Sequence, residues 1–284
     1  MHVRSVYHGH LRYEDWIGKT EKHEDTITAW PLSALAATLD GDAPGDTVPP
    51  LWHWLYFLPT HRQSELGADG HARRGAFLPP VDLPRRMWAG GRFEFQDALR
   101  LGDRAVRTSR ILQVQEKQGR SGPLVFVVVR HEVHTPRGLA LAEEHDIVYR
   151  GHPRPEDVPV IQEAPGDAAW ERTVHPDDVL LFRYSALTFN GHRIHYDRRY
   201  CTEVEGYPGL VVHGPLIATL LMELAREQDE GEVARFRFRA VSPLFDTEPF
   251  VVCGKREGER VSLWARTPSG RLAMTAEAEF SFSR

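Results

Sequence analysis

The densest group of polar side chains in the sequence lies in residues 183–200, RYSALTFNGHRIHYDRRY. An amide, Asn190, and two imidazoles, His192 and His195, come close together there. Imidazole titrates near neutral pH, so a histidine can take up and return a proton during a reaction. A carboxamide can orient water or a substrate but cannot accept a proton at ordinary pH. The cluster therefore predicts acid–base chemistry at His195, and a solvated loop whose histidines cap turns is the alternative.

A second candidate motif, His213-Gly214-Pro215, stands at the start of the apolar segment Leu216 to Arg226. Proline is well suited to the first turn of a helix, so the motif predicts a helix N-terminus. Such a terminus offers free backbone N–H groups and the positive end of a dipole, which can stabilise a developing oxyanion. Glycine at position 214 allows a ligand to approach the backbone closely, and a helix entry that merely needs space is the alternative.

The composition argues against several classes of protein. The 284 residues carry a formal net charge of −5, without the basic excess usual in a nucleic-acid binder. No apolar run approaches the ~20 residues needed to cross a bilayer, and the N-terminus, MHVRSVYHGHLRYEDW, has no apolar signal-peptide core. Two cysteines are too few for a disulfide scaffold or a four-thiolate zinc site. We expect a cytoplasmic protein with no nucleic-acid or membrane partner.

Metal sites and other catalytic motifs find little support in the sequence. The pairs His192/His195 and His131/His134 are each spaced by three residues, but neither belongs to an HExxH pattern. A nucleophilic serine in G-x-S-x-G and a glycine-rich phosphate loop are both absent from the sequence. We therefore expect no metal ion.

Two pairs of similar segments indicate an internal duplication. Residues 92–103, RFEFQDALRLGD, match residues 235–246, RFRFRAVSPLFD. Residues 135–142, TPRGLALA, match residues 267–274, TPSGRLAM, in the same order along the chain. The second pair is followed by alternating segments, EEHDIVY and TAEAEF, and both matches lie on strand-like parts of the chain, so a structural repeat is the simplest interpretation.

Each half of the chain contains strand-like segments preceded by one apolar segment of helix length. Strands are predicted at 124–129, at 133–148 as a hairpin, and at 250–253, 261–264 and 273–282. The apolar segments are Leu51 to Phe57, after Pro49-Pro50, and Leu216 to Arg226. A helix that is apolar almost all round is expected to be buried, here inside a curved sheet. The pattern resembles a hot-dog domain, and its repetition predicts an α+β double hot dog.

The duplication also sets the domain boundaries that we expect. Residues 1–150 would form an N-terminal hot-dog domain, and residues 171–284 a C-terminal domain with the polar cluster. Residues 151–170, rich in proline, glycine and acidic residues, would link them. In the first half, residues 67–88 predict an ordered loop over the surface. The first half shows no comparable polar cluster, so we expect it to shape the pocket without acting in catalysis.

Residues 188–216 resemble the hydratase motif of the MaoC-like enoyl-CoA hydratases, through FNGHRIHYD at 189–197 and VVHGPL at 211–216. The whole chain is similar to the mesaconyl-C4-CoA and itaconyl-CoA hydratases, relatives of the hydroxyacyl-thioester dehydratases. The family motif is Asp-x-Asn-Pro-x-His-x-Asp. Aligned on His195, it places Asn190 at the usual catalytic aspartate, His192 at the usual asparagine and Arg193 at the usual proline, while Asp197 matches the last aspartate.

This resemblance implies a hydro-lyase that adds water reversibly across the double bond of a short, dicarboxylic enoyl-CoA, with citramalyl-CoA as the product. The implied catalytic residues are Asn190, His195 and Gly214. His195 would take a proton from water, Asn190 would orient water or substrate, and the Gly214 N–H would bind the thioester carbonyl.

The residues expected to bind the substrate are His192, Arg193, Asp197, Arg198 and His213. Guanidinium groups among them would hold the second carboxylate, because they bind carboxylates bidentately. The acyl-CoA thioester is the expected partner. CoA is part of this substrate, so no separate cofactor is expected. Both a monomer and a homodimer are compatible with the sequence. Two other functions stay open. Hot-dog folds also serve thioester hydrolysis, which leaves an acyl-CoA thioesterase, and the replacement of an aspartate by Asn190 leaves a non-catalytic acyl-CoA-binding subunit.

Overall fold

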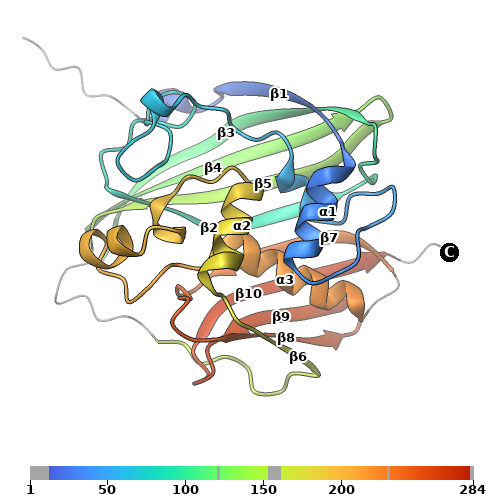
Figure 1. Ribbon diagram of the computed structural model, residues 1–284. Helices are drawn as coiled ribbons and strands as arrows, with labels where there is room; N and C mark the ends of the chain where they lie inside the picture. The colour runs from blue at the N-terminus through green and yellow to red at the C-terminus, as the bar shows by residue number, and fades with distance from the viewer. Residues whose placement is uncertain (1–12, 120–121, 153–160, 229–230, 282–284) are drawn as a thin grey trace, which may run out of the picture.

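Ten antiparallel strands form one continuous sheet in the computed structural model (Figure 1). The structure describes residues 13–119, 122–152, 161–228 and 231–281. The strands, in spatial order, are β1 (Thr20–Thr26), β3 (Arg104–Gly119), β4 (Gly122–Thr135), β5 (Gly138–Arg150), β2 (Arg85–Phe95), β7 (Glu232–Ala240), β10 (Leu272–Ser281), β9 (Arg260–Arg266), β8 (Phe250–Glu257) and β6 (Trp170–Val174). The helices lie together on one face of this sheet, which therefore holds the core (Figure 1).

The two halves of the sheet have the same strand order, which accounts for the repeat in the sequence. The order is β1-β3-β4-β5-β2 in the first half and β6-β8-β9-β10-β7 in the second, and β2 pairs with β7 at the seam. The matching RFEF and RFRF segments lie in these two seam strands, where Phe93 pairs with Phe236. Both rings are buried, with centroids 5.8 Å apart. The predicted architecture, two helix-and-sheet repeats in one chain, is the observed one.

Helix α3 (Gly214–Glu227) packs against strands β7 to β10 of the second half. Pro215 stands in its first turn, where a missing N–H leaves no hydrogen bond unmade. Its buried residues are Leu216, Ile217, Ala218, Thr219, Leu220, Leu221, Met222, Leu224 and Ala225. The prediction of a buried helix over this segment is confirmed.

The prediction of a helix over Leu51 to Phe57 is wrong. This segment forms a single 3-10 turn, η2 (Trp52–Leu55), and the flanking Leu51 and Phe57 have positive φ angles of 71° and 56°. Pro49-Pro50 precede the turn and Pro59 follows it, and a residue before proline disfavours the helical conformation, so a longer helix has no room. The α-helix of the first half is instead α1 (Ala29–Thr38), which buries Leu32 and Leu35.

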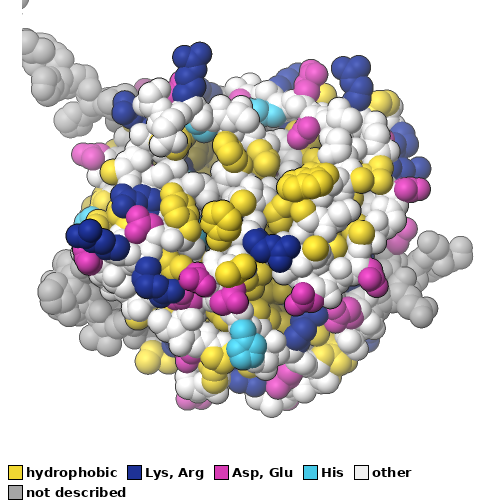
Figure 2. All heavy atoms as spheres, viewed as in Figure 1, with side chains coloured by type: hydrophobic (Ala, Val, Ile, Leu, Met, Phe, Trp, Pro, Cys, Tyr) yellow, Lys and Arg dark blue, Asp and Glu magenta, His cyan; other side chains and the backbone are white. Residues whose placement is uncertain are grey.

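Helices α1 and α2 (Asp178–Leu187) contact each other, and each also exposes apolar side chains. Trp30 on α1 and Phe182 on α2 are 72% and 62% exposed. Figure 2 shows apolar side chains interspersed with charged ones over these two helices. No helix among the described residues has the length and apolar character needed to cross a membrane.

The expected linker, residues 151–170, lies between the end of β5 at Arg150 and the first residue of β6, Trp170. Residues 153–160 of this segment lie outside the described residues, as does the end of the strand expected to reach residue 282. The division into two domains with these boundaries stays a prediction.

Candidate functional site

His195 ends the short 3-10 helix η4 (Arg193–His195), and a backbone carbonyl fixes its ring. The Nδ1 atom lies 2.7 Å from the carbonyl oxygen of Val211. A carbonyl can only accept a hydrogen bond, so Nδ1 carries the proton and Nε2 keeps its lone pair. The His195 side chain is only 8% exposed. The structure thus presents Nε2 as a sheltered acceptor, suited to take a hydrogen bond from water.

His213 supports the ring of His195 and is the N-cap residue of α3. The two imidazoles are stacked, with centroids 3.7 Å apart and planes inclined by 17°. His213 is 1% exposed, and its Nε2 shares a 2.7 Å hydrogen bond with the Ser185 hydroxyl of α2. Because this burial leaves His213 almost no free surface, its geometry fits a supporting role better than the substrate contact expected from the sequence.

Gly214 follows His213 directly, so its amide lies beside the stacked imidazoles. Within the described part of the chain no group accepts a hydrogen bond from this amide, as is usual in the first turn of a helix. A Cβ atom added at Gly214 would meet no heavy atom within 4 Å. Packing within the protein therefore does not require glycine at this position.

Asn190 closes the loop that leads into η4. Its Oδ1 accepts a 3.0 Å hydrogen bond from the backbone N–H of His192, and its own backbone N–H donates to the Ser185 carbonyl at 2.8 Å. Asparagine commonly stabilises turns through such contacts. The His192 ring meets the His195 ring edge to face, with centroids 5.4 Å apart. Asn190 thus positions the two imidazoles, and its amide oxygen is already engaged.

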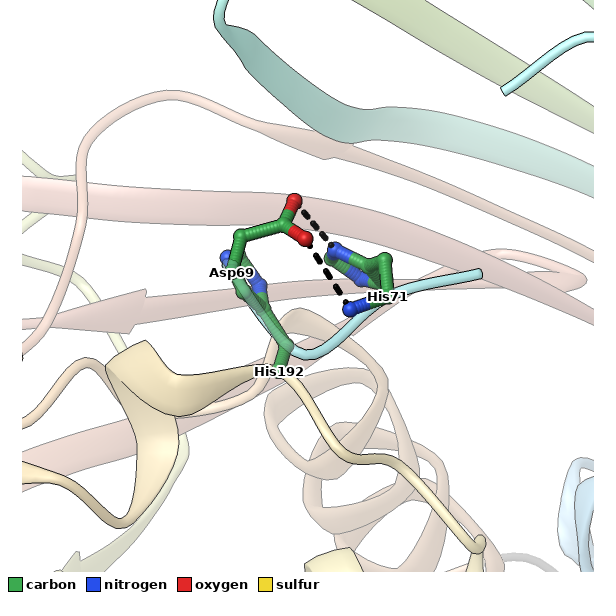
Figure 3. Close-up of side chains that lie close together, drawn as sticks. All are labelled: Asp69, His71 and His192. Carbon is green, nitrogen blue, oxygen red and sulfur yellow. Dashed lines mark hydrogen bonds and ion pairs between the residues drawn. The ribbon is translucent and has the colours of Figure 1, made fainter. Parts of the chain in front are cut away.

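A loop of the first half brings two more polar side chains to this group (Figure 3). The ring of His71 lies against that of His192, with centroids 4.0 Å apart. His71 Nδ1 is 3.2 Å from Asp69 Oδ2, and the His71 backbone N–H donates to Asp69 Oδ1 at 3.1 Å. The loop predicted to run over the surface therefore contributes a carboxylate and an imidazole that the sequence did not single out.

Backbone contacts hold this loop on the hydratase motif. The Arg193 N–H donates to the Asp69 carbonyl at 2.9 Å, and its guanidinium donates to the Ala68 carbonyl at 3.1 Å. Gly70 has a φ of +88°, and a Cβ atom there would lie 1.8 Å from the Gly191 carbonyl oxygen. A Cβ atom at Gly191 would in turn lie 2.9 Å from the Gly70 oxygen. Neither position has room for a side chain, so this close approach and the Arg193 hydrogen bonds together hold the Asp69–His71 segment against the motif.

Burial keeps the imidazoles of the motif neutral. It lowers the pKa of His195 to about 4, and the Val211 carbonyl, which favours the charged ring, opposes this in part. Burial, followed by the charges of His71 and His195, lowers the pKa of His192 to about 2. Burial also holds the pKa of His213 well below its ordinary value. At neutral pH these three rings are therefore hydrogen-bond donors and acceptors without charge.

Asp69 and His71 form a carboxylate–imidazole pair, which differs from the three neutral rings because one member carries a charge. Burial raises the pKa of Asp69, but the hydrogen bonds and charge of His71 lower it further, so that it lies well below its ordinary range. Burial and then the charge of Arg86 lower the pKa of His71, whereas Asp69 raises it. At neutral pH the pair is an ionised carboxylate that accepts a hydrogen bond from a neutral imidazole.

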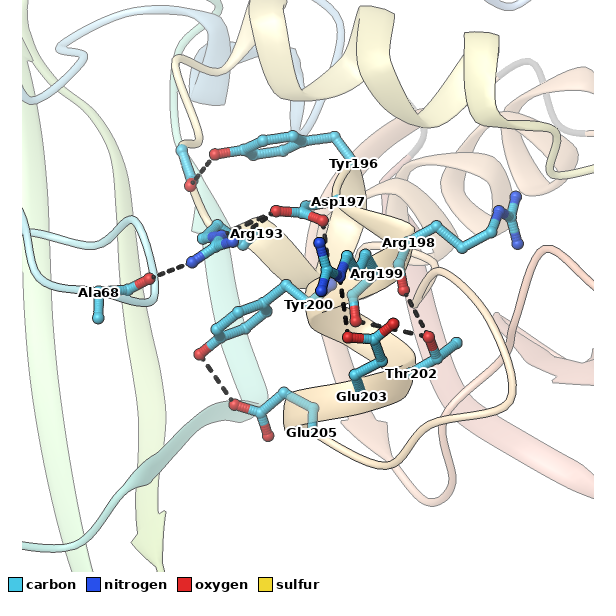
Figure 4. Close-up of polar contacts among 11 residues, drawn as sticks. Ala68, Arg193, Tyr196, Asp197, Arg198, Arg199, Tyr200, Thr202, Glu203 and Glu205 are labelled. Atoms are coloured by element: carbon cyan, nitrogen blue, oxygen red, sulfur yellow. Dashed lines mark hydrogen bonds and ion pairs between the residues drawn. The ribbon is translucent and has the colours of Figure 1, made fainter.

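The other residues expected to bind substrate are engaged with protein groups (Figure 4). Arg193 Nη2 lies 2.7 Å from Asp197 Oδ2, and the guanidinium lies over the ring of Tyr200. Arg198 forms an ion pair with Asp246, and its side chain is 53% exposed. Since both guanidinium groups already have carboxylate partners, they position the loop in this structure, and their predicted contact with substrate finds no support in the geometry.

The first half contains a buried polar cluster of its own. Glu143 is 2% exposed, and its Oε2 lies 3.0 Å from Trp54 Nε1, 3.2 Å from His53 Nε2 and 3.1 Å from His145 Nε2. His131 lies directly opposite Glu143 in the pairing of β4 with β5. The expectation that the first half lacks such a cluster is wrong, because its members come from positions far apart in the sequence.

Two groups of described residues have the composition of a metal site. They are Asp69 with His71 and His192, and His131 with Glu143 and His145. Within each group the possible ligand atoms lie within 4.8 Å of one another. The expectation that the protein needs no metal ion and no cofactor stays a prediction.

Comparison with known proteins places this chain in one family. The family model for hydroxyacyl-thioester dehydratase type 2 matches residues 51–246. A solved MaoC-like dehydratase superposes with a TM-score of 0.72, covering 96% of this chain and 100% of that one at 13% identity. A Mycobacterium tuberculosis protein with a double hotdog fold gives a TM-score of 0.57 over 95% of this chain and 98% of its own, at 14% identity. The chain belongs to the hydroxyacyl-thioester dehydratase type 2 family, whose members are hydro-lyases.

One relative within this group is much more similar in sequence. Over 270 residues the chain is 50% identical to the mesaconyl-C4-CoA hydratase of Chloroflexus aurantiacus, covering 93% of this chain and 96% of that protein. The expected family, the double hot-dog fold and the hydro-lyase class are therefore confirmed.

Proposed function

We propose that the chain adds water reversibly across the double bond of a short, dicarboxylic enoyl-CoA, mesaconyl-C4-CoA or itaconyl-CoA, to form citramalyl-CoA. The proposal depends on one observation above all. His195 is stacked on His213 at the start of α3, beside a Gly214 amide that no described residue engages. The activity named for the Chloroflexus aurantiacus relative supports the choice of substrate.

The start of α3 binds and polarises the thioester. The Gly214 N–H donates to the thioester carbonyl, and the positive end of the helix dipole stabilises the negative charge that develops on this oxygen. Electron withdrawal toward the oxygen makes the β-carbon electrophilic. His195 Nε2 accepts a hydrogen bond from the water that attacks this carbon, while its Nδ1–H stays on the Val211 carbonyl. Asn190 acts by holding the loop that carries the two imidazoles.

Arg86 supplies the positive charge that a dicarboxylic substrate needs. It lies directly opposite Tyr149 in the pairing of β2 with β5, so both side chains leave the same face of the sheet, where Tyr149 is fully buried. Among the described residues no carboxylate forms an ion pair with Arg86. Its charge acts on both His71 and His192. A guanidinium without an acidic partner beside these imidazoles is suited to hold the carboxylate on the β-carbon of mesaconyl-C4-CoA.

The proposal also gives each half of the chain a role. Residues 171–284 form the domain that carries the hydratase motif, residues 151–170 link the domains, and residues 1–150 shape the pocket. The acyl-CoA thioester is the partner, the expected compartment is the cytoplasm, and both a monomer and a homodimer are consistent with one continuous sheet.

Incubation with mesaconyl-C4-CoA tests the proposed reaction. We expect the conjugated double bond to disappear and the product mass to rise by one water, with the thioester intact. The His195→Gln variant should lose this activity, on the order of 10²-fold in kcat, because the attacking water is no longer held in position. Release of free CoA thiol would instead indicate a thioesterase, and CoA binding without turnover of any enoyl-CoA would indicate a non-catalytic subunit.

A comparison of two substrates tests the role of Arg86. The Arg86→Gln variant should raise KM for mesaconyl-C4-CoA, whereas turnover of crotonyl-CoA, which lacks the second carboxylate, should change little. Arg73→Gln, at an exposed arginine of the loop that precedes β2, is the matched control. Equal effects of Arg86→Gln on both substrates would contradict the assignment.

A further inference from the structure

The proposed hydration requires a group that takes a proton from water, and the hydratase motif of this chain supplies that group poorly. Asn190 stands where the family has an aspartate, and a carboxamide does not accept a proton. His195 is buried with a carbonyl and two neutral imidazoles around it, so its charged form has no counter-ion nearby. His195 can therefore orient water well but stabilises a transferred proton badly.

The pair Asp69–His71 has the property that His195 lacks. Asp69 Oδ2 is 3.2 Å from His71 Nδ1, so the carboxylate holds the proton on Nδ1 and leaves the lone pair on Nε2. No described residue forms a hydrogen bond to that Nε2 atom. If His71 takes up a proton there, the adjacent carboxylate stabilises the imidazolium, which is how an aspartate serves a catalytic histidine in other enzymes. The pair is thus built to accept a proton and return it.

The placement of this pair is a fixed feature of the fold. The His71 ring contacts the His192 ring, and the His192 ring contacts the His195 ring. The charge of His71 also acts on His195. The reciprocal contact between Gly70 and Gly191, together with the hydrogen bond from Arg193 to Asp69, holds the loop at this distance.

We propose that Asp69 and His71, contributed by the first half, form the acid–base pair of the hydration, in the place of the aspartate that the motif has lost. This inference rests on the proposed function and assigns catalytic residues to a half expected only to shape the pocket.

The step balances with this pair alone. As the water oxygen bonds to the β-carbon, its O–H bond breaks and the proton passes to His71 Nε2. The π electrons move toward the thioester oxygen and form an enolate, which the Gly214 N–H stabilises. The enolate then takes the proton from His71 Nε2 at its α-carbon, which regenerates the neutral imidazole. His195 holds the water through its second O–H and stays neutral throughout.

The charged groups around His71 set the conditions for this role. Asp69 favours the imidazolium, whereas Arg86 and Arg74 oppose it. A substrate carboxylate bound at Arg86 neutralises part of that opposing charge, so substrate binding makes His71 a better proton acceptor. Asp69, His71 and His192 could also ligate a metal ion, and this alternative is included in the test.

The test compares four variants with the wild type, with mesaconyl-C4-CoA as substrate. His71→Gln and Asp69→Asn remove the pair, and His61→Gln and Asp82→Asn make the same chemical changes at exposed positions of the same segment. We expect kcat to fall on the order of 10²- to 10⁴-fold in His71→Gln and less in Asp69→Asn, with KM and the melting temperature close to wild type. The limb of the pH–kcat profile that reports the base should be absent from the residual activity of His71→Gln. Dialysis against EDTA should leave the wild type fully active.

The outcomes separate this inference from the proposed function. If the wild type hydrates the substrate and His71→Gln stays within threefold of His61→Gln, the acid–base role of the pair is refuted while the function stands. If the losses follow a lowered melting temperature, or if EDTA removes the activity and a divalent metal restores it, the role is also refuted. Failure of the wild type to hydrate any enoyl-CoA would refute the proposed function itself.

Discussion

Substitution of Gly70 by alanine tests the site most directly, because Gly70 makes the closest backbone contact there. The Cβ atom would lie 1.8 Å from the Gly191 oxygen, whereas real Cβ contacts stay above 3.0 Å, so the loop must move by about 1.2 Å. That movement lengthens the two hydrogen bonds from Arg193 to the Asp69 and Ala68 carbonyls. A displacement of about 1 Å can cost on the order of 10²-fold in rate when it misplaces groups that act on the substrate.

Gly102→Ala is a matched control for the backbone. Gly102 has a φ of +86°, close to the +88° of Gly70, but a Cβ atom there would meet nothing within 4 Å. Both variants should therefore lose ~1–2 kcal/mol of unfolding free energy from the left-handed conformation. Gly70→Ala should lose about 2 kcal/mol more, from two hydrogen bonds at ~1 kcal/mol each.

Urea unfolding and steady-state hydration kinetics measure the two effects. We expect Gly70→Ala to lower kcat on the order of 10²-fold and Gly102→Ala to leave it near wild type. If the two variants have equal kcat, the docking of the first-half loop contributes nothing to activity, and the reasoning from the glycine contact is refuted.

Three further predictions concern the buried groups. Gly214→Ala should retain the wild-type urea midpoint, because a Cβ atom there has open space, yet lower kcat/KM by occupying the room of the thioester; unchanged kinetics would contradict this. The unfolding free energy should fall as the pH drops from 7 to 5. The folded-state pKa of His195 is about 4 and that of His213 also lies below 6.5, so the unfolded chain takes up protons first. A urea midpoint that stays constant over this pH range would count against the prediction. Glu143→Ala should lose about 3–5 kcal/mol of unfolding free energy, because the change leaves His53 and Trp54 without their buried partner. Glu144→Ala, at a more exposed neighbouring position, should lose much less. Urea unfolding of both variants measures the difference.

Features of the fold that repeat along the chain could be predicted from the sequence. The RFEF and RFRF segments are strands because side chains alternate there, and their similarity pointed correctly to a duplication. Helix α3 was predictable because Pro215 and a continuous apolar run mark its start and its burial. The prediction of a helix over Leu51 to Phe57 failed because this segment is apolar as a buried, irregular turn. Apolar composition alone does not distinguish such a turn from a short helix.

The site was predictable where its residues are neighbours in sequence, as with His195 and the start of α3. Asp69 and His71 stand more than a hundred residues before the motif, and backbone contacts of their loop with Gly191 and Arg193 bring them there. The glycine in Asp69-Gly70-His71 was the one available signal, although glycine is common in loops. Glu143 and His131 face each other only once the register of β4 and β5 is known, because a shift of one residue would turn them to opposite faces.

The seam between β2 and β7 has a consequence for how this protein could diverge. In an assembly of two identical subunits, every substitution appears twice, so a loop that docks at one site must be tolerated at the symmetric position as well. Here one polypeptide contains both copies, and each can change alone. One copy could therefore keep the motif before α3 while the other extended a loop that docks on this motif.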